Sequence, residues 1–216
     1  MTKSFPGFLI LAAGQATRFG GHKLIQPINK HQSVIEAGLD RIIKATSSIS
    51  SDIPIGIVVS KDNDVLAAHL NQLLQNQLLQ SHPQMQLLRF PGSSPGLGDS
   101  IRFAVEATSD WQGWFICLAD MPLIKVETYT SLLALSKAHN IVIPTQHNHP
   151  GHPVYFSHQF AADLLALHGD KGAKRIWQDH HEQCHFVEVN DPGIQLDIDS
   201  KQDLEQAQQH FISTDY

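Results

Sequence analysis

The chain has 216 residues, of which 42% are hydrophobic and 17% charged, as is ordinary for a globular domain with its own core. Its formal net charge is −6, and no run of lysine or arginine provides the clustered cations that duplex nucleic acid requires, although a few local cations suffice for a nucleotide. The two cysteines are far apart and predict buried thiols in a reducing compartment. No apolar stretch approaches the roughly twenty residues of a membrane helix, and the amino-terminal run is too short for a signal peptide. We therefore expect a cytoplasmic protein that binds neither nucleic acid nor membrane.

Short apolar runs alternate with longer amphipathic segments along the first half of the chain. The runs show little polar alternation, which is typical of strands buried on both faces of a parallel sheet, and we predict strands over 8–13, 55–60, 85–90 and 114–119. Helical spacing of apolar residues predicts helices over 33–46, with Ser33 as N-cap, over 62–80 and over 98–108. This strand–helix order predicts a Rossmann-like, mostly parallel, doubly wound sheet in a three-layer α/β/α fold.

The second half is less regular. We predict a helix over 126–139, strands over 141–144 and 153–157, a helical stretch to about 178, a strand over 185–189, an extended strand over 195–199 and a closing helix near 200–212. No repeat or linker interrupts the chain, so we expect a single domain over 1–216. Its nucleotide-binding half would be about 1–122 and its acceptor-binding half about 123–216.

A glycine-containing loop follows the first predicted strand, in the stretch LILAAGQATRFGGHK (9–23). Gly14 lets the backbone come close to a bound group, Arg18 can donate a planar fork of hydrogen bonds, and Lys23 adds a compact charge. The stretch has neither G-x-G-x-x-G nor a terminal G-K-[ST], which disfavours a dinucleotide site and a Walker loop. Taken alone, it fits a phosphate-binding loop or a turn with two solvated cations equally well.

The same loop carries a family resemblance. LAAGQATRFGGHKLIQP (11–27) resembles the L-A-A-G-x-x-x-R-[FM]-G-x-x-K-x-x-x-P signature of the nucleotidyltransferases, which couple a nucleoside triphosphate to a phosphorylated acceptor and release pyrophosphate. The resemblance implies that the triphosphate is bound by Leu11, Ala12, Ala13, Gly14, Arg18 and Lys23. It also implies that Arg18 and Lys23 act in catalysis by stabilising charge on the phosphates.

A triphosphate needs Mg²⁺, and Mg²⁺ needs one or two carboxylates. Asp120 directly follows the predicted strand in WFICLADMPLI (114–124), too early to cap the helix that begins near 126. LADMPL is similar to the family's L-G-D-M-P-L motif, with Ala119 in the place of glycine, and the resemblance makes Asp120 the catalytic metal ligand. QLDIDSKQDL (195–204) resembles L-D-I-D-T-P-E-D-L. Asp199 is then either the second metal ligand, which we favour, or the N-cap of the last helix.

A second glycine-rich turn, PGSSPGLGDSIRFAV (91–105), precedes a predicted helix whose free amides suit a phosphate or a base edge. It resembles the G-[ML]-x-x-S-[IL] stretch of the family's nucleotide pocket, which assigns Gly96, Leu97 and Ser100 to nucleotide binding. A turn that only caps the helix, with Ser100 in the first turn of that helix, would have a similar sequence.

Three later segments narrow the resemblance. HPGHPVYF (149–156), LHGDKGAKRIW (167–177) and VNDPGIQLDID (189–199) are similar in order and spacing to segments of the molybdenum cofactor cytidylyltransferases, which join CMP to the terminal phosphate of molybdopterin. The resemblance places His152, Gly169, Asp170 and Gly172 on the acceptor side. Pro150 stands where the family usually has arginine or another polar residue.

The sequence thus predicts a nucleotidyltransferase that uses Mg²⁺, CTP and a molybdopterin-type acceptor, with a molybdoenzyme as the recipient of its product. GTP or ATP as donor, or a sugar phosphate as acceptor, is an alternative in the same class. A non-catalytic nucleotide-binding accessory protein is an alternative of another class. A zinc site at His147, His149 and His152 is disfavoured, because no cysteine or acidic partner lies nearby in sequence.

Overall fold

The computed structural model describes residues 5–14, 19–75, 82–92 and 96–214, with the backbone alone for 212–214. Its strands form one mixed sheet in the order β3-β2-β1-β4-β7-β5-β6, with β8 paired to β5. The strands are β1 Gly7–Leu11, β2 Ile55–Ser60, β3 Met85–Phe90, β4 Gly113–Leu118, β5 Ile141–Gln146, β6 His149–Pro150, β7 Val154–Ser157 and β8 Cys184–Glu188. β1 to β4 pair in parallel, whereas β7 is antiparallel to both β4 and β5.

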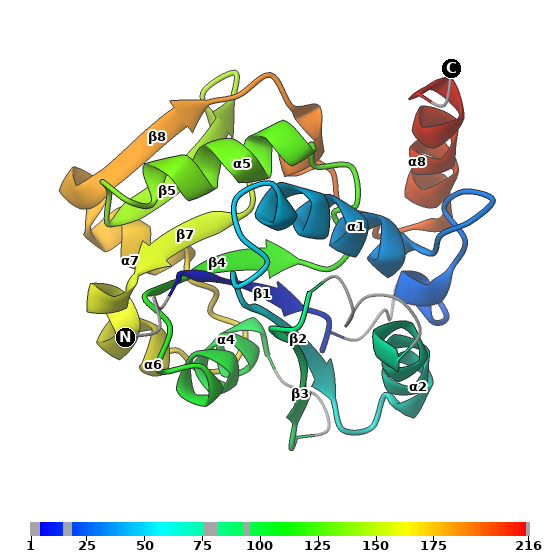
Figure 1. Ribbon diagram of the computed structural model, residues 1–216, viewed down its shortest axis with the longest axis horizontal. Helices are drawn as coiled ribbons and strands as arrows, with labels where there is room; N and C mark the ends of the chain where they lie inside the picture. Colours follow the sequence, from blue (N-terminus) through cyan, green and yellow to red (C-terminus); the bar gives the residue numbers. More distant parts are fainter. Residues whose placement is uncertain (1–4, 15–18, 76–81, 93–95, 215–216) are drawn as a thin grey trace.

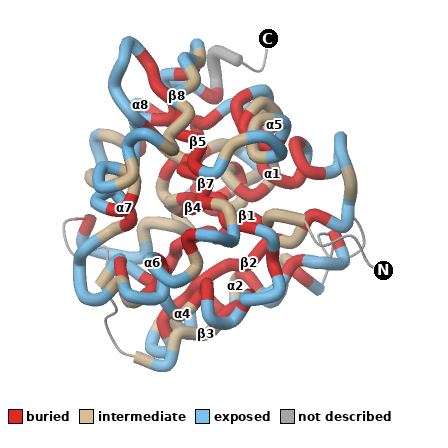
Figure 2. Tube along the Cα trace, turned by 90° about the vertical axis from the view of Figure 1, so that its left-hand side faces the viewer, coloured by how far each residue is buried: buried red, intermediate tan, exposed pale blue. Residues whose placement is uncertain are grey.

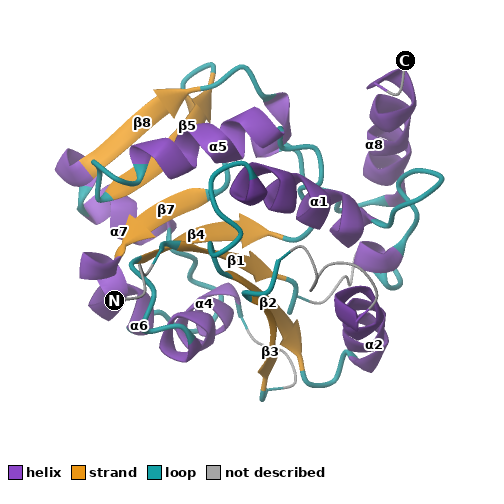
Figure 3. Ribbon diagram, viewed as in Figure 1, coloured by secondary structure: helices purple, strands orange, loops and turns teal. Residues whose placement is uncertain are grey.

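Helices cover both faces of this sheet (Figures 1 and 3). The helices are α1 Val34–Ser47, α2 Asp64–Leu73, α4 Leu97–Ala107, α5 Val126–Leu135, α6 Ala161–Leu165, α7 Lys174–Asp179 and α8 Lys201–Thr214. α1, α2 and α5 pack on one face, and α4, α6 and α7 on the other. The fold is therefore the three-layer, mostly parallel α/β arrangement that the strand–helix order predicts.

The alternation of side chains along β1 explains the two cores. Phe8 and Ile10 belong to the core beneath α1 and α5, while Leu9 and Leu11 belong to the core beneath α4. Successive side chains of a strand point to opposite faces, so a strand between two helical layers needs apolar residues at every position. In Figure 2 the buried residues accordingly follow the central strands, and exposed residues gather on the surrounding helices and loops.

The predicted start of α1 is confirmed. Ser33 precedes the helix in an extended conformation, and its backbone N–H donates to the Glu36 carboxylate at 2.6 Å as part of a capping box. The predicted strands over 55–60 and 85–90 have the same bounds in the structure. The predicted helix over 62–80 begins at Asp64, and residues 76–80 lie outside the described part of the chain.

Two predictions in the second half are wrong. The helix from 126 ends at Leu135 and not at 139. The extended segment over 195–199 is no strand: a 3-10 turn, Pro192–Gln195, is followed by residues without regular structure. The Asp191 carboxylate accepts the Gly193 N–H at 3.0 Å and so fixes this turn, which the hydrophobic pattern alone does not show.

α8 packs beside the start of α1 in a third, smaller core. Phe211, Leu204 and Ala207 of α8 meet Val34 and Ala37 of α1 there. Among the described residues, no helix combines the length and apolar character needed to cross a membrane.

Candidate active site

A cleft of about 520 Å³ opens where β1, β2 and β4 end. Its walls include Leu11 at the end of β1 with the following residues to Gly14, Ser60 at the end of β2, and Ala119 and Asp120 after β4. Ligands of open α/β sheets gather at this edge, because the carboxyl ends of parallel strands leave loops and backbone groups pointing to one crevice. The structure thus brings most of the predicted triphosphate-binding residues to one cleft. Arg18 lies outside the described residues.

Lys23 stands between two carboxylates in this cleft. Its ammonium Nζ lies 2.7 Å from Asp120 Oδ2 and 3.2 Å from Asp199 Oδ1, and only 11% of the lysine side chain is exposed. Burial lowers the pKa of Lys23, but the charges and hydrogen bonds of Asp120 and Asp199 outweigh it and hold the pKa above its usual value. The lysine is therefore fully charged at neutral pH.

A single backbone hydrogen bond explains why Asp199 reaches the cleft. The Ile198 N–H donates to the Asp120 carbonyl at 3.0 Å, so the irregular segment before α8 is fastened to the end of β4. Two aspartates 79 positions apart, 120 and 199, thereby face the same ammonium. No regular strand is needed for this approach.

The structure also separates the two roles considered for Asp199. The N-cap of α8 is Ser200, whose hydroxyl accepts the Asp203 N–H at 3.2 Å, while the Asp203 carboxylate accepts the Ser200 N–H at 2.7 Å. This reciprocal pair is a capping box with aspartate at the third position. Because Ser200 caps the helix, the Asp199 carboxylate is turned towards Lys23 instead.

The pair Asp120 and Asp199 fits a hard divalent cation. Their oxygens converge on one positive group, Lys23 Nζ, so a cation is already favoured at this point. Mg²⁺ and Mn²⁺ prefer oxygen ligands, and Mg²⁺ is commonly held by one or two carboxylates, with phosphates and water completing its shell. Within the described ranges, no group of three or more His, Cys, Asp or Glu side chains could hold a metal. The two carboxylates would therefore supply only part of the ligand shell of a metal, and water or the oxygens of a bound substrate would complete it.

Sequence reasoning missed the wall formed by the end of β2. Ser60, Asp62 and Asn63 line the same cleft as Ala119. Asn63 also caps α2, since its side-chain oxygen accepts the Leu66 N–H at 3.1 Å. These residues could have been predicted from their position in the chain, because the predicted parallel strand over 55–60 had to end at the same edge of the sheet as the strand before the glycine loop.

A second cavity, of about 240 Å³, lies on the other side of β4, against the starts of α4 and α7. His152, Gly172 and Leu97 all line it. The ring nitrogen Nδ1 of His152 lies 3.4 Å from the Ile116 carbonyl oxygen. Burial lowers the pKa of His152, and the Ile116 carbonyl and the charges of Asp120 and Asp197 oppose that shift.

Three predicted glycines lie where the start of α4 meets the loop before α7. The Gly98 N–H donates to the Gly169 carbonyl at 2.8 Å, and the Gly169 N–H donates to the Asp99 carboxylate at 3.0 Å. A Cβ at Gly96 would overlap the Gly169 carbonyl group, and one at Gly172 would press on Leu97. We name this contact between residues 96–99 and 168–172 the glycine junction. Asp170 belongs to it through its backbone nitrogen, the third atom that a Cβ at Gly96 would meet.

The start of α4 therefore meets the segment that the sequence resemblance assigned to the acceptor side. Leu97 lines the second cavity with His152 and Gly172, and it is absent from the walls of the cleft that contains Gly14. Ser100 is buried and donates its hydroxyl hydrogen bond to the Gly96 carbonyl at 3.2 Å, within its own helix. One amide of the helix start, that of Gly98, is already used by the protein itself.

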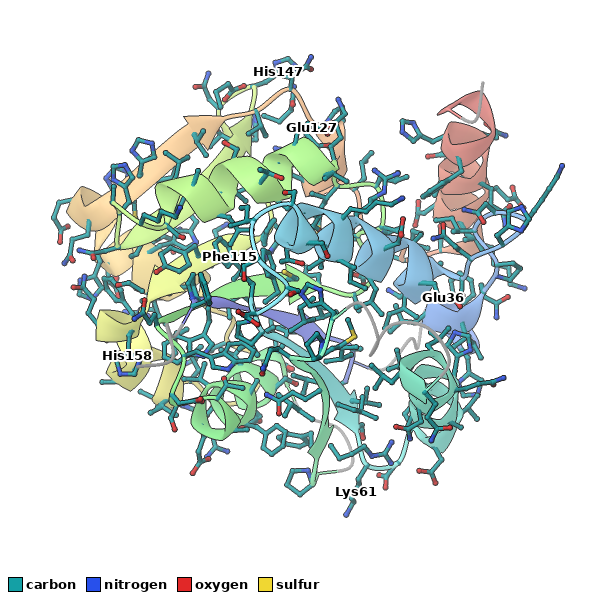
Figure 4. All side chains as sticks on the ribbon, viewed as in Figure 1. Glu36, Lys61, Phe115, Glu127, His147 and His158 are labelled. Carbon is teal, nitrogen blue, oxygen red and sulfur yellow. The ribbon has the colours of Figure 1, made fainter. Side chains whose placement is uncertain are left out.

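The histidine-rich loop divides between two places. His147 and Asn148 form a left-handed turn at the tip of β5 and β6, where the Glu188 carboxylate accepts their backbone N–H groups. Figure 4 shows His147 at this tip, at the opposite end of the view from Lys61, whose sequence neighbours Ser60 and Asp62 line the cleft. His152 lies in the second cavity instead.

Comparisons with known proteins agree with this geometry. The family model described as "MobA-like NTP transferase domain" matches residues 8–184. A search of curated proteins finds no match. Among solved structures, Rv0371c from Mycobacterium tuberculosis is 20% identical, with a TM-score of 0.74 over 96% of this chain and 99% of that one, and it has also been solved with manganese.

Two further neighbours are more distant in sequence. A 4-diphosphocytidyl-2C-methyl-D-erythritol synthase from Anaerococcus prevotii is 13% identical, with a TM-score of 0.72 over 97% of this chain and 99% of that one. Molybdopterin-guanine dinucleotide biosynthesis protein A from Archaeoglobus fulgidus is 14% identical, with a TM-score of 0.62 over 96% of this chain and 100% of that one. At these identities the neighbours show a shared fold.

Proposed function

The chain belongs to the MobA-like NTP transferase domain family, and from that premise we propose that it transfers CMP from CTP to the terminal phosphate of a molybdopterin-type cofactor and releases pyrophosphate. One observation carries the nucleotidyl transfer: the Lys23 ammonium lies between Asp120 and Asp199 in the cleft beside the Leu11–Gly14 loop. A lysine and two carboxylates at the end of a parallel strand supply both the positive charge and the metal ligands that a triphosphate needs.

The reaction we propose is a displacement at the α-phosphorus. An oxygen of the acceptor phosphate forms the new bond to phosphorus, and the bond from that phosphorus to the bridging oxygen of the β-phosphate breaks. Pyrophosphate leaves with the electron pair of that bond. The acceptor phosphate is already ionised at neutral pH, so no side chain has to remove a proton.

Each cleft residue has a role in this proposal. Gly14 allows the backbone amides of the loop to approach the phosphates, and a Cβ there would meet no atom of the described structure within 4 Å. Lys23, held charged by its carboxylate partners, donates to the phosphate oxygens, and Arg18 adds a planar pair of donors. Asp120 and Asp199 would hold Mg²⁺, which when bound neutralises charge on the phosphates.

The acceptor side of the proposal rests on the second cavity and the segments around it. His152 and Gly172 line this cavity, while Gly169 and Asp170 form the glycine junction at its edge. Leu118 lines this cavity, and Ala119 and Asp120, which follow it in the chain, line the cleft, so the cavity lies close to the proposed reaction centre. One structural neighbour is named for a molybdopterin dinucleotide and another for a cytidylylated methylerythritol, so neighbours of this fold differ in acceptor.

Incubation with each of the four nucleoside triphosphates, Mg²⁺ and molybdenum-loaded molybdopterin tests the proposal through pyrophosphate release. We expect release with CTP and little with the others. A clear preference for GTP or ATP would contradict CTP as the donor but would still support nucleotidyl transfer. Tight binding of a triphosphate without turnover would favour an accessory protein.

A further inference from the structure

The second cavity has a chemical character that its proposed acceptor role does not by itself require. Its walls are formed mainly by aliphatic side chains of β4, β7 and α4, by Pro150 and by the indole of Trp177. Ile116 and Leu118 come from the face of β4 that is buried beneath α4. At about 240 Å³ the cavity is smaller than the roughly 300–1,000 Å³ of sites that enclose a whole drug-sized ligand. It therefore accommodates one ring system of a larger molecule.

On the side formed by β4 and residues 150–152, the backbone of this cavity offers few hydrogen-bond donors. The Gly151 N–H donates to the Pro144 carbonyl and the His152 N–H to the Ile194 carbonyl, both at 2.9 Å, and Pro150 has no N–H. Ile116 lies in β4 between β1 and β7, where the sheet ladders use its backbone groups. A polyol chain placed against this wall would lose its hydrogen bonds to water and find few replacements there, which is costly.

Trp177 gives the cavity a flat aromatic wall. The residue is partly exposed, whereas Trp111 and Trp114 are buried in the core. Phe186 meets the Trp177 ring edge to face, with centroids 6.0 Å apart, and so supports it from one side. Aromatic rings stack favourably on planar heterocycles, and the indole also offers one N–H donor.

Lys174 adds the positive charge. It is exposed, it begins α7, and it lines the same cavity as Trp177 three residues later. A phosphorylated ligand with a planar ring could therefore stack on Trp177 while its phosphate accepts hydrogen bonds from the Lys174 ammonium. An uncharged apolar ligand would make no such bond to the ammonium.

On the proposed transferase function, we propose that this cavity receives the planar heteroaromatic ring of the phosphate acceptor, with Trp177 as the specificity-determining contact that selects such acceptors over polyol phosphates. The nucleobase belongs in the larger cleft, because Ser60, Asp62 and Asn63 supply polar groups there beside the triphosphate loop. The acceptor class is accordingly a fused heterocycle that carries a phosphorylated side chain.

Calorimetric titration with two small phosphates tests this proposal. The probes are 6-hydroxymethylpterin phosphate, as the ring, and ribitol 5-phosphate, as the polyol. We expect the pterin phosphate to bind at least about tenfold more tightly than the polyol phosphate, since stacking on one aromatic ring contributes an effect of that order. Equal affinities, tighter binding of the polyol, or binding of neither probe would overturn the proposal.

Variants of α7 assign the effect to the indole. Trp177→Ala should weaken the pterin phosphate roughly tenfold, Trp177→Phe should keep affinity within about threefold, and Gln178→Ala, an exposed neighbour, should leave it unchanged. The retained ring of Trp177→Phe keeps the test valid if the alanine variant folds poorly. An unchanged affinity in Trp177→Ala, or a loss of CTP affinity with pterin affinity intact, would overturn the proposal, the latter by placing the nucleobase in this cavity.

Pyrophosphate release separates the two proposals. If no triphosphate is turned over and the pterin phosphate still binds through Trp177, the transfer reaction is refuted and the ring site stands as a binding site. If turnover proceeds and the KM of the acceptor is the same in Trp177→Ala as in the native protein, the ring site is refuted and the transfer reaction stands.

Discussion

The two cavities beside the end of β4 differ in how their polar groups are used. In the cleft, Lys23, Asp120 and Asp199 are drawn together, and the two carboxylates hold the pKa of Lys23 above its usual value. In the second cavity, the amides of Gly151 and His152 are consumed by the protein, and an indole and aliphatic side chains remain. The same strand serves both, because its core-facing residues line the apolar cavity and its carboxyl end carries the aspartate. A sheet edge can thus present charge and a ring-binding surface side by side.

The largest expected effect comes from a change in the cleft, at Asp120. Asp120→Asn keeps the size of the side chain and removes the charge that the proposed metal requires, so kcat should fall at least about a hundredfold while the fold is retained. Pyrophosphate release measures this. Asp179→Asn, which removes an exposed carboxylate paired with Arg175 within α7, is the matched control and should leave kcat unchanged. Full activity in Asp120→Asn would break the assignment.

The next effect sharpens the role of Lys23. Its ammonium competes with a metal for both carboxylates, so Lys23→Met should raise the affinity of the nucleotide-free protein for Mn²⁺ by about three- to tenfold and at the same time lower turnover. Calorimetric titration with MnCl₂ measures the affinity. Lys44→Met, which breaks the exposed pair with Asp40, controls for the loss of a lysine. Weaker Mn²⁺ binding in Lys23→Met would show that the carboxylates do not form the metal site.

A pair of glycine variants compares the two regions directly. Gly96→Ala forces a methyl group onto the Gly169 carbonyl in the glycine junction and should lower the free energy of unfolding by about 1–3 kcal/mol. The methyl group of Gly14→Ala meets no atom of the described residues within 4 Å, so this variant should change that free energy by less than about 0.5 kcal/mol and raise the KM of the triphosphate. Urea denaturation measures both. Equal free energies of unfolding in the two variants would show that the backbone of the glycine junction can shift to accept a methyl group at little cost.

The smallest expected effect is a pH dependence of stability that comes from His152 in the second cavity. Because burial lowers the pKa of His152 in the folded protein, the unfolded chain takes up the proton more readily as the pH falls through about 6.5. Stability from this group is thus present above that pH and lost below it, by at most about 1.4 kcal/mol per pH unit. Urea denaturation between pH 7 and 5 should show a shallower slope in His152→Gln than in the native protein. His149→Gln, at an exposed histidine of the same loop, is the control, and identical slopes in all three would contradict the role of burial.

The sequence predicted the parts of this molecule that depend on local pattern. Unbroken apolar runs predicted the buried strands, and Ser33 predicted the start of α1, because hydrophobic burial and helix capping act over a few residues. The placement of Asp120 at the edge of the sheet followed from its position directly after such a run.

What the sequence could not predict depends on contacts between distant segments. Asp199 lies close to Lys23 because the Ile198 N–H donates a hydrogen bond to the Asp120 carbonyl. Residues 196–199 have no regular structure, although a strand was predicted over 195–199. Leu97 reached the cavity of His152 because Gly96 and Gly98 fit against residues 169 to 171. Neither contact leaves a periodic signal, and glycine is chosen there by the close approach of another backbone.

The fate of the α-phosphorus tests the central claim most directly. CTP labelled at that atom is incubated with Mg²⁺, the protein and the molybdopterin acceptor, and the products are separated. Our account predicts that the label appears in a nucleotide joined to the acceptor, in equal amount to the pyrophosphate released. Label that appears only as free CMP or CDP would indicate hydrolysis, and label that remains in CTP would show that the cleft does not transfer nucleotides to this acceptor.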